Sequence, residues 1–530
     1  MGKTYINRSK TKAYLVGGGI ASLAAAVYLI KEARLPGKNI HILEQGSING
    51  GALDGSGDPD AGYLIRGGRM HERHFGCTWD LLSNIPSLDN PDKSVCDETF
   101  EFSKKIVSRS TSRLLKDGEK MDVSSYGLSN TDKVDILKLR FSSEEALGAK
   151  RIEDCFSPDF FNTVFWQLWS TSFAFQRWSS VVEMRRYFIR FMHLLPAFNE
   201  LGGIMRTLYN QYDSVILPTE RWLKGQGVCF IMNSQVTDIE FDIGETEKRA
   251  SAIRYLSDGR EETIKLSKND YLFVTLGSMV EGASTGSMSS PAPLNEKCKA
   301  GAWALWENIA KKDTSFGRPG TFCDHTGLSK WMSFTVTMKD PAFFEHMEAF
   351  TGNIAGSGGL VTFTDSNWLM SVVLAHQPHF RNQPEDVYVF WGDGLLPDRE
   401  GNFVKKRMSD CSGEEILVEL FSHLEIMEKM RPLMDKTKCI PCMMPFIDAQ
   451  FLPRIPGDRP QVVPEGAANF AFLGQFVEVP DDCVFTVEYS VRTAQTAVFS
   501  LLALDREVTP VYNGSHDICV LLDALNAINR

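Results

Sequence analysis

A glycine-rich turn between two apolar runs near the N-terminus constrains this chain more than any other feature. The apolar run 13–16 ends in Gly17-Gly18-Gly19, residues 20–33 have helical composition, and a second apolar run, 40–43, ends in Glu44. This order of strand, glycine turn, helix, strand and acid is typical of a Rossmann βαβ unit. The sequence therefore predicts that this part of the chain binds a dinucleotide.

The chemistry of such a unit assigns a role to individual residues. Gly17 allows the tight turn, and Gly19 lets a pyrophosphate approach the backbone N–H groups at the helix N-terminus, where the helix dipole favours anions. Ser22 stands where a third glycine is usual, and it is small enough for close packing of helix on strand. Glu44 is placed to accept hydrogen bonds from the hydroxyls of the adenosine ribose.

Features farther along the chain favour FAD over NAD. Gly50-Gly51 follows the acid closely, 271–278 is a further buried strand, and 470–475 is a late strand that ends in glycine before a helix at 488–503. Such a late strand and helix typically close an FAD site against the first βαβ unit. The predicted cofactor-binding residues are Gly17, Gly19, Ile20, Ala21, Glu44, Gln45, Gly51, Ala52, Arg69, Val236, Ser278, Gln475 and Thr486.

The length of the chain predicts more than one domain. Its 530 residues exceed the roughly 250–300 at which a single hydrophobic core stops growing. We expect an α/β protein in which a discontinuous Rossmann-type FAD domain carries an inserted, largely helical and aromatic-rich substrate lobe and a mixed α+β part. The predicted ranges are 1–80 with 215–290 and 460–505 for the FAD domain, 81–214 and 291–459 for the substrate lobes, and 506–530 for a short helical segment.

Composition excludes several classes of function. The net charge of -11 argues against a nucleic-acid-binding protein, which would need a basic face. The 11 cysteines are odd in number and show no pairing pattern, which fits a reducing cytosol and predicts a cytoplasmic protein.

Cys439 and Cys442 have CxxC spacing, but without a second pair nearby we predict packing and no metal site. The uncharged stretch 13–30 superficially resembles a signal peptide or membrane span, and its glycines favour a buried strand and helix instead.

The inserted lobe is rich in aromatic residues. Residues 160–175 hold seven of them, and 179–195 shows apolar residues at helical spacing with Tyr187 on the apolar face. Two interpretations fit this pattern. The aromatic residues either form a core in which the Tyr187 hydroxyl finds a backbone partner, or they line a long apolar tunnel.

A series of motifs in the same order resembles the oleate hydratase family, formerly called myosin-cross-reactive antigens. The motifs are Arg66-Gly67-Gly68-Arg69, Trp79-Asp80-Leu81-Leu82, Ile85-Pro86-Ser87-Leu88, Phe173-Ala174-Phe175, Glu183-Met184-Arg185-Arg186-Tyr187, Tyr209-Asn210-Gln211-Tyr212-Asp213, 364–371, Gln377-Pro378-His379-Phe380, Gly457-Asp458-Arg459-Pro460 and 486–493. They extend from about residue 12 to 505.

The resemblance implies a redox-neutral reaction. Water and a proton add across a cis double bond of a long-chain unsaturated fatty acid, and FAD shapes the site without a net gain of electrons. Tyr187 occupies the position of the family's proton donor. Protonation of an alkene creates carbocation character, so an acid is needed at one carbon and a held water at the other.

One departure from the family concerns the water. Most relatives carry a glutamate after the Arg-Gly-Gly-Arg run, and this chain has Met70 there. His71 or Glu72 are the nearest replacements, and the flavin or a backbone carbonyl are others. The alternative for Glu72 is a solvated loop carboxylate. We therefore take Tyr187, Glu72, His71 and Met70 as the candidate catalytic positions.

A second departure lies where the substrate carboxylate is expected. Val373 and Ala375 stand where relatives have a threonine and an asparagine, Gln211 and His379 remain, and His376 is new. We predict Gln211, His376 and His379 as substrate-binding residues in a rearranged pocket.

Other functions share the cofactor argument. A redox flavoenzyme acting on a lipid (a desaturase or an amine-oxidase-like enzyme), a double-bond isomerase and a non-catalytic fatty-acid-binding flavoprotein are the alternatives. The largely missing basic C-terminal region of some relatives predicts at most peripheral membrane contact, and a monomer or homodimer.

Overall fold

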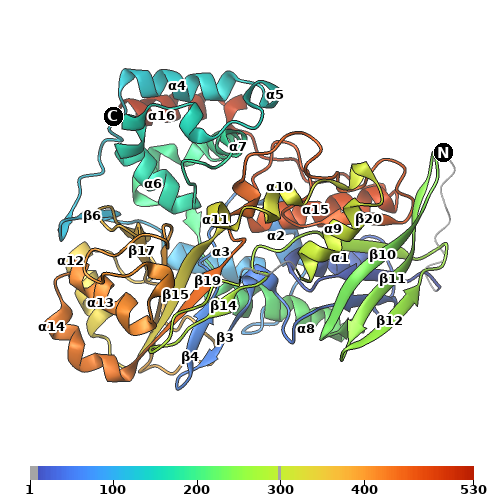
Figure 1. Ribbon diagram of the computed structural model, residues 1–530, viewed down its shortest axis with the longest axis horizontal. Coiled ribbons are helices and arrows are strands. Elements are labelled where there is room, and N and C mark those ends of the chain that lie inside the picture. Colours follow the sequence, from blue (N-terminus) through green and yellow to red (C-terminus); the bar gives the residue numbers. More distant parts are fainter. Residues whose placement is uncertain (1–9, 296–299) are drawn as a thin grey trace.

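The computed structural model describes residues 10–295 and 300–530, so residues 1–9 of the predicted FAD domain lie outside it. The predicted α/β class is confirmed. A parallel five-stranded sheet lies at the centre of the cofactor half, in the order β20-β13-β1-β2-β9 (Figure 1). Its strands are β20 (Phe470–Leu473), β13 (Tyr271–Thr275), β1 (Ala13–Val16), β2 (Ile40–Leu43) and β9 (Cys229–Ile231). Each of the three chain segments predicted for the cofactor domain contributes at least one strand.

Two helices from opposite ends of the chain pack together on this sheet. Helix α1 (Ile20–Lys31) is alanine-rich, so its backbone can approach its neighbours closely, and α15 (Val487–Leu501) lies against it. Ser22 fills the narrow space between α1 and the sheet, where its hydroxyl lies 3.1 Å from the Thr275 hydroxyl. The N-terminal βαβ unit and the late strand and helix therefore close on each other as the sequence predicts.

A second sheet of eight strands forms the α+β part, in the order β14-β19-β15-β18-β17-β16-β6-β7. Its strands are β14 (Ser284–Thr285), β19 (Thr437–Met444), β15 (Trp331–Met338), β18 (Tyr388–Gly394), β17 (Met370–Val373), β16 (Leu360–Phe363), β6 (Leu114–Lys116) and β7 (Glu119–Lys120). The two predicted substrate segments thus share one sheet, and β14 joins it from within the range predicted for the cofactor domain.

One face of the second sheet packs on α12 (Ala342–Thr351) and α13 (Gly413–His423) in a separate apolar core. The opposite face turns toward the core of the cofactor half. Residues three apart on a strand point to opposite faces. Cys439 therefore belongs to the apolar core with α12 and α13, and Cys442 belongs to the core of the cofactor half. Both cysteines are buried and free, as the packing interpretation predicts.

The helical lobe lies at the top of Figure 1. Its helices are α4 (Asn130–Phe141), α5 (Glu144–Leu147), α6 (Val164–Phe173), α7 (Val181–Arg190) and the C-terminal α16 (Ile518–Asn529). The helix expected over 179–195 is shorter: α7 ends at Arg190, and a 3-10 segment, Met192–Glu200, follows because Phe191 leaves the helical conformation. Trp169 contacts Phe165, Phe173 and Phe198 ring to ring, so the aromatic residues fill this lobe as a core.

The other elements complete the two halves. They are α2 (Gly76–Ser83), α3 (Val95–Lys105), α8 (Leu217–Gly225), α9 (Ala302–Ala310), α10 (Gly320–Cys323), α11 (Thr326–Ser329), α14 (Met427–Met430), β3 (Gly55–Asp58), β4 (Gly62–Ile65), β5 (His71–Glu72), β8 (Ile204–Met205), β10 (Ser234–Ile243), β11 (Lys248–Ser257) and β12 (Arg260–Lys265). Across residues 10–295 and 300–530, none of the helices is long and apolar enough to cross a membrane.

Candidate cofactor and substrate site

A cavity of about 610 Å³ opens at the carboxyl ends of β1, β2, β13 and β20. This is the edge at which ligands bind in doubly wound sheets. All the cofactor-binding residues that the sequence predicts, from Gly17 to Thr486, lie in its wall. The cavity brings together residues from distant parts of the chain, within 16–69, 234–236, 275–305 and 474–490.

The three glycines of the turn differ in what surrounds them. Gly17 has a φ of +92°, which glycine adopts without strain. A Cβ on Gly18 would lie 2.1 Å from the Asn49 side-chain oxygen, whereas a Cβ on Gly19 would meet nothing within 4 Å. Gly18 is thus required by the protein itself, and Gly19 faces open space at the N-terminus of α1, which no side chain caps.

Two acidic residues lie at the same end of the cavity. The Glu44 carboxylate accepts hydrogen bonds from the backbone N–H groups of Gly18 at 2.6 Å and Gly46 at 2.7 Å. Glu281 also lines the cavity and accepts from the N–H groups of Ala302 and Trp303. Burial raises the pKa of Glu281 to about 8 against the lowering effect of these bonds. Glu281 was not predicted, because it lies several residues after the end of β13 and belongs to no recognised motif.

The far end of the cavity is formed by the loop before α15. Gln475 donates to the Thr486 carbonyl oxygen and the Ser490 hydroxyl, and Thr486 caps α15 by accepting from the Tyr489 N–H. Phe485 has a φ of +70°, which is rare for a bulky residue and marks local strain. The Arg69 guanidinium lies over its ring at 5.2 Å.

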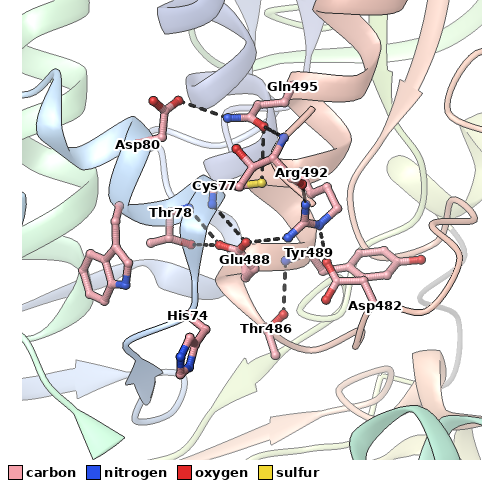
Figure 2. A network of polar contacts seen from close by, with 12 residues as sticks. His74, Cys77, Thr78, Asp80, Asp482, Thr486, Glu488, Tyr489, Arg492 and Gln495 are labelled. Atoms are coloured by element: carbon pink, nitrogen blue, oxygen red, sulfur yellow. Dashed lines mark hydrogen bonds and ion pairs between the residues drawn. The ribbon is translucent and has the colours of Figure 1, made fainter. Parts of the chain in front are cut away.

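A buried ionic network holds this loop in place (Figure 2). The Glu488 carboxylate accepts from the Thr78 N–H and hydroxyl on α2 and pairs with Arg492 at 2.7 Å. Arg492 also pairs with Asp482 at 2.7 Å. Each charge in the network has a partner, and these attractions offset part of the cost of removing the charges from water. It fixes residues 482–486 between α2 and α15.

A second, smaller cavity of about 50 Å³ adjoins the first. The predicted substrate-binding residues Gln211, His376 and His379 all lie in its wall, together with Val373 and Ala375. Arg69 lines both cavities. The side-chain nitrogen of Gln211 donates to the Gly67 carbonyl oxygen at 2.7 Å, which ties the second cavity to the loop that carries Arg69.

Arg206 is a residue of this second cavity that sequence reasoning missed. Its side chain lines the cavity, its Nε has no hydrogen-bond partner within the described chain, and burial lowers its pKa to about 10. Burial, together with Arg206 and His376, lowers the pKa of His379 to about 3, so this imidazole is neutral near pH 7. The cavity therefore holds two guanidinium groups, those of Arg69 and Arg206, among neutral hydrogen-bonding groups. In the sequence, the only indication that Arg206 belongs to this site is its position five residues before Gln211.

Tyr187 lies in neither cavity wall. Its hydroxyl donates to the Val484 carbonyl oxygen at 2.5 Å, in the loop that the ionic network fixes, and its ring contacts Phe173 and Phe175. Burial raises the pKa of Tyr187 well above its ordinary value. The phenol is therefore neutral. Its hydrogen-bond partner, Val484, directly precedes Phe485, which lines the cofactor cavity.

The residues proposed to replace the missing glutamate also face away from both cavities. Glu72 is 1% exposed and pairs with Arg190 at 2.9 Å, so the interpretation as a solvated loop carboxylate is wrong. His71 is buried beside Trp79, and burial with the nearby Arg69 lowers its pKa to about 4. Met70, directly after Arg69, is half-buried and belongs to neither wall.

The environment of Glu72 makes a testable prediction about stability. Burial disfavours its charge, but His193, Arg190 and the His74 N–H outweigh burial and lower its pKa to about 2. A depressed folded-state pKa stabilises the protein above the unfolded value near 4.5, and this contribution is lost as the pH falls toward 2. We expect Glu72→Gln to cost roughly 1.5–3 kcal/mol at pH 7. Urea unfolding at pH 7 and pH 3 measures this, and an equal cost at both values contradicts the ionic explanation.

Comparison with known proteins gives one family match and two similar relatives. The model of the MCRA family matches residues 10–499. An oleate hydratase of Streptococcus pyogenes serotype M49 (strain NZ131) is 39% identical over 529 residues, which cover 98% of this chain and 89% of that protein. A linoleate hydratase of Lactiplantibacillus plantarum is 32% identical over 550 residues, covering 95% and 96%.

The fold is also similar to that of solved structures. Cyclohexylamine oxidase from Brevibacterium oxydans IH-35A superimposes with a TM-score of 0.52 at 11% identity, and the match covers 93% of this chain and 99% of that one. At this identity the likeness concerns the fold alone. The family match over most of the length and the identity to two hydratases agree with the motifs seen in the sequence, and the chain belongs to the MCRA family.

Proposed function

We propose that this protein is an FAD-dependent hydratase that adds water across a cis double bond of a long-chain unsaturated fatty acid, without net redox change. The observation that carries the proposal is the position of Arg69, which lines both the large nucleotide-type cavity and the small cavity that also holds Arg206. A cofactor and an acidic substrate would thus meet at one residue. The two hydratases at 39% and 32% identity support this reaction class.

The large cavity fits FAD in its donor chemistry. Gly19 leaves open space at the uncapped N-terminus of α1, where backbone N–H groups suit a pyrophosphate, and Glu44 suits a ribose. Gln475 and Thr486 lie at the other end, near Arg69. In a redox-neutral reaction bound FAD would shape and polarise the site. The protein's own groups would orient the fatty acid and exchange protons with it.

The small cavity suits the carboxylate of a fatty acid. Arg206 would pair with it, and Gln211, His376 and neutral His379 would supply hydrogen bonds around it. A volume of about 50 Å³ holds a head group but no acyl chain. We therefore place the chain past Arg69, toward the cofactor cavity, with Tyr187 behind Phe485 as the proton donor that the family resemblance implies.

Mass spectrometry tests this function directly. Oleic and linoleic acid are incubated with the protein, FAD and H₂¹⁸O, and we expect a product that has gained one labelled water. An isomerase would instead return a product of unchanged mass with a shifted double bond. A redox flavoenzyme would bleach the flavin under anaerobic conditions, and a binding protein would return the acid unaltered. Any of these three results contradicts the proposal.

A further inference from the structure

A row of buried polar side chains crosses the second sheet on the face that turns toward the cofactor half. Thr362 is paired with Ser371, Ser371 with Asp393, Asp393 with Ser333, and Ser333 with Cys442 on five neighbouring strands. Cross-strand partners share one face of a sheet. All five side chains are buried. The other face of the same strands is apolar, so the row is a localised polar wall inside the protein.

The acid in this row lacks the partners that buried charges normally have. Asp393 is 5% exposed, and no hydrogen bond to its side chain occurs among the described residues. A second acid, Asp448, is 3% exposed and lies near Trp331, and its Oδ1 has no hydrogen-bond partner in the described chain. Burial raises the pKa of both carboxyl groups well above the ordinary value, and Asp393 adds to the effect on Asp448. Burial therefore favours the neutral carboxylic acid form of both.

Chain neighbours of the two acids line the small cavity on one side and contact the Tyr187 ring on the other. Trp391, two residues before Asp393 on the same face of β18, lines the small cavity beside Arg69. Leu395, two residues after Asp393, accepts a hydrogen bond from Gln176, the neighbour of Phe175. Both Phe175 and Phe451, which follows Asp448 by three residues, contact the Tyr187 ring. The electrostatic effect of Asp448 on Tyr187 agrees with this placement.

The charged side chains on the elements around Asp393 and Asp448 already have hydrogen-bond or ion-pair partners of their own. Arg66 pairs with Asp54 and donates to the Cys442 sulfur, and Glu183 on α7 pairs with Arg454 and Arg459. Arg69 donates to the Ala52 carbonyl oxygen. Arg66 is thus a cation in contact with the polar row, at Cys442.

We propose that Asp393 and Asp448 are the proton reservoir of the hydration reaction, a role that rests on the proposed function. After Tyr187 gives its proton to one alkene carbon, one of the two carboxylic acids returns a proton to the tyrosine oxygen. The resulting carboxylate takes up the proton that water loses as its oxygen bonds to the other carbon. One C–H and one C–O bond form, the π bond is consumed, and tyrosine and carboxylic acid end as they began. Neither Met70 nor Glu72 is then needed as the base.

The test compares Asp393→Asn and Asp448→Asn with the surface control Asp410→Asn, all loaded with FAD. We expect kcat for the labelled-water reaction to fall roughly 10²–10⁴-fold in the first two variants, the usual effect of losing proton-transfer catalysis. Fatty-acid Kd and FAD content should stay unchanged. The wild-type rate should decline as rising pH ionises the pair, and this decline should disappear from the residual rate of the variants.

Stability supplies a readout apart from activity. A raised carboxyl pKa stabilises the folded protein below the unfolded value near 3.8, and this contribution is lost as the pH rises. We therefore expect both asparagine variants to melt at a higher temperature than wild type at pH 8 and to lose this advantage at pH 4.

The outcomes separate the possibilities. Unchanged kcat in both variants overturns the proton reservoir and leaves the hydratase proposal intact. A fall in kcat accompanied by loss of FAD or fatty-acid binding, or by lower melting temperature at pH 8, assigns the acids a structural role and also overturns it. If Asp393→Asn does not fold, Asp448→Asn decides. A wild-type protein that hydrates neither fatty acid overturns the proposed function and this inference together.

Discussion

Replacing Gly19 by leucine is expected to abolish FAD binding in a protein that still folds. The Cβ at this position meets no protein atom within 4 Å, and the backbone has no positive φ, so the substitution causes no strain in the protein itself. The new side chain would instead project into the space where a pyrophosphate would approach the N-terminus of α1. We expect Kd for FAD to rise by at least about 10³-fold, or about 4 kcal/mol. Fluorescence titration of the apoprotein measures it.

Gly225→Leu is the matched control. A Cβ on Gly225 also meets nothing within 4 Å, but this residue lies exposed on α8, away from the cavity. The control should bind FAD like wild type, and thermal unfolding should show that both variants are folded. Unchanged FAD affinity in Gly19→Leu would mean that the turn does not carry the pyrophosphate.

Replacing Tyr187 by phenylalanine is expected to lower kcat roughly 10²–10⁴-fold, because it removes the proposed acid and keeps the ring. The ring contacts with Phe173, Phe175 and Phe451 remain available to phenylalanine, so packing should change little. Initial rates on oleic acid at saturating FAD measure the effect. KM should stay near the wild-type value, since the hydroxyl lies outside the small cavity.

Tyr126→Phe tests whether such a loss is specific. Tyr126 is also buried, and its hydroxyl donates to the Leu195 carbonyl oxygen at 2.5 Å, as that of Tyr187 does to Val484. Both variants lose one hydrogen bond of the same kind, each contributing about 1 kcal/mol to stability. Equal and near-normal turnover in the two variants would assign Tyr187 to the aromatic core alone.

The cofactor half was predictable because its signals are local. A strand, a turn that needs glycine, a helix and an acid follow one another within about 30 residues, and each has its own physical reason to take that conformation. Gln475 and Thr486 were found for the same reason, as the end of a strand and the start of a helix. The polar residues of the small cavity came from the family resemblance, and the structure brings Gln211, His376 and His379 to one wall.

The direction of side chains in the loop after Arg69 could not be read from the sequence. Glu72 turns toward Arg190 on α7, a partner far along the chain that no local pattern indicates. Asp393 and Asp448 were missed for a related reason. Asp393 lies within β18, a strand of largely apolar composition, and Asp448 follows the end of β19 by four residues. Only the register of β15, β17 and β18 reveals that Asp393 belongs to a polar row.

The order of strands in the cofactor sheet has a consequence for biosynthesis. β1 lies beside β13, and β13 beside β20, so the sheet that begins at residue 13 is complete only after residue 473 has been made. At about 5–20 residues per second, the first βαβ unit leaves the ribosome roughly 20–90 s before its last partner. Its apolar strands must stay free of aggregation during that interval. The proposed FAD would therefore be bound tightly only by finished chains, whose folded state its binding would stabilise.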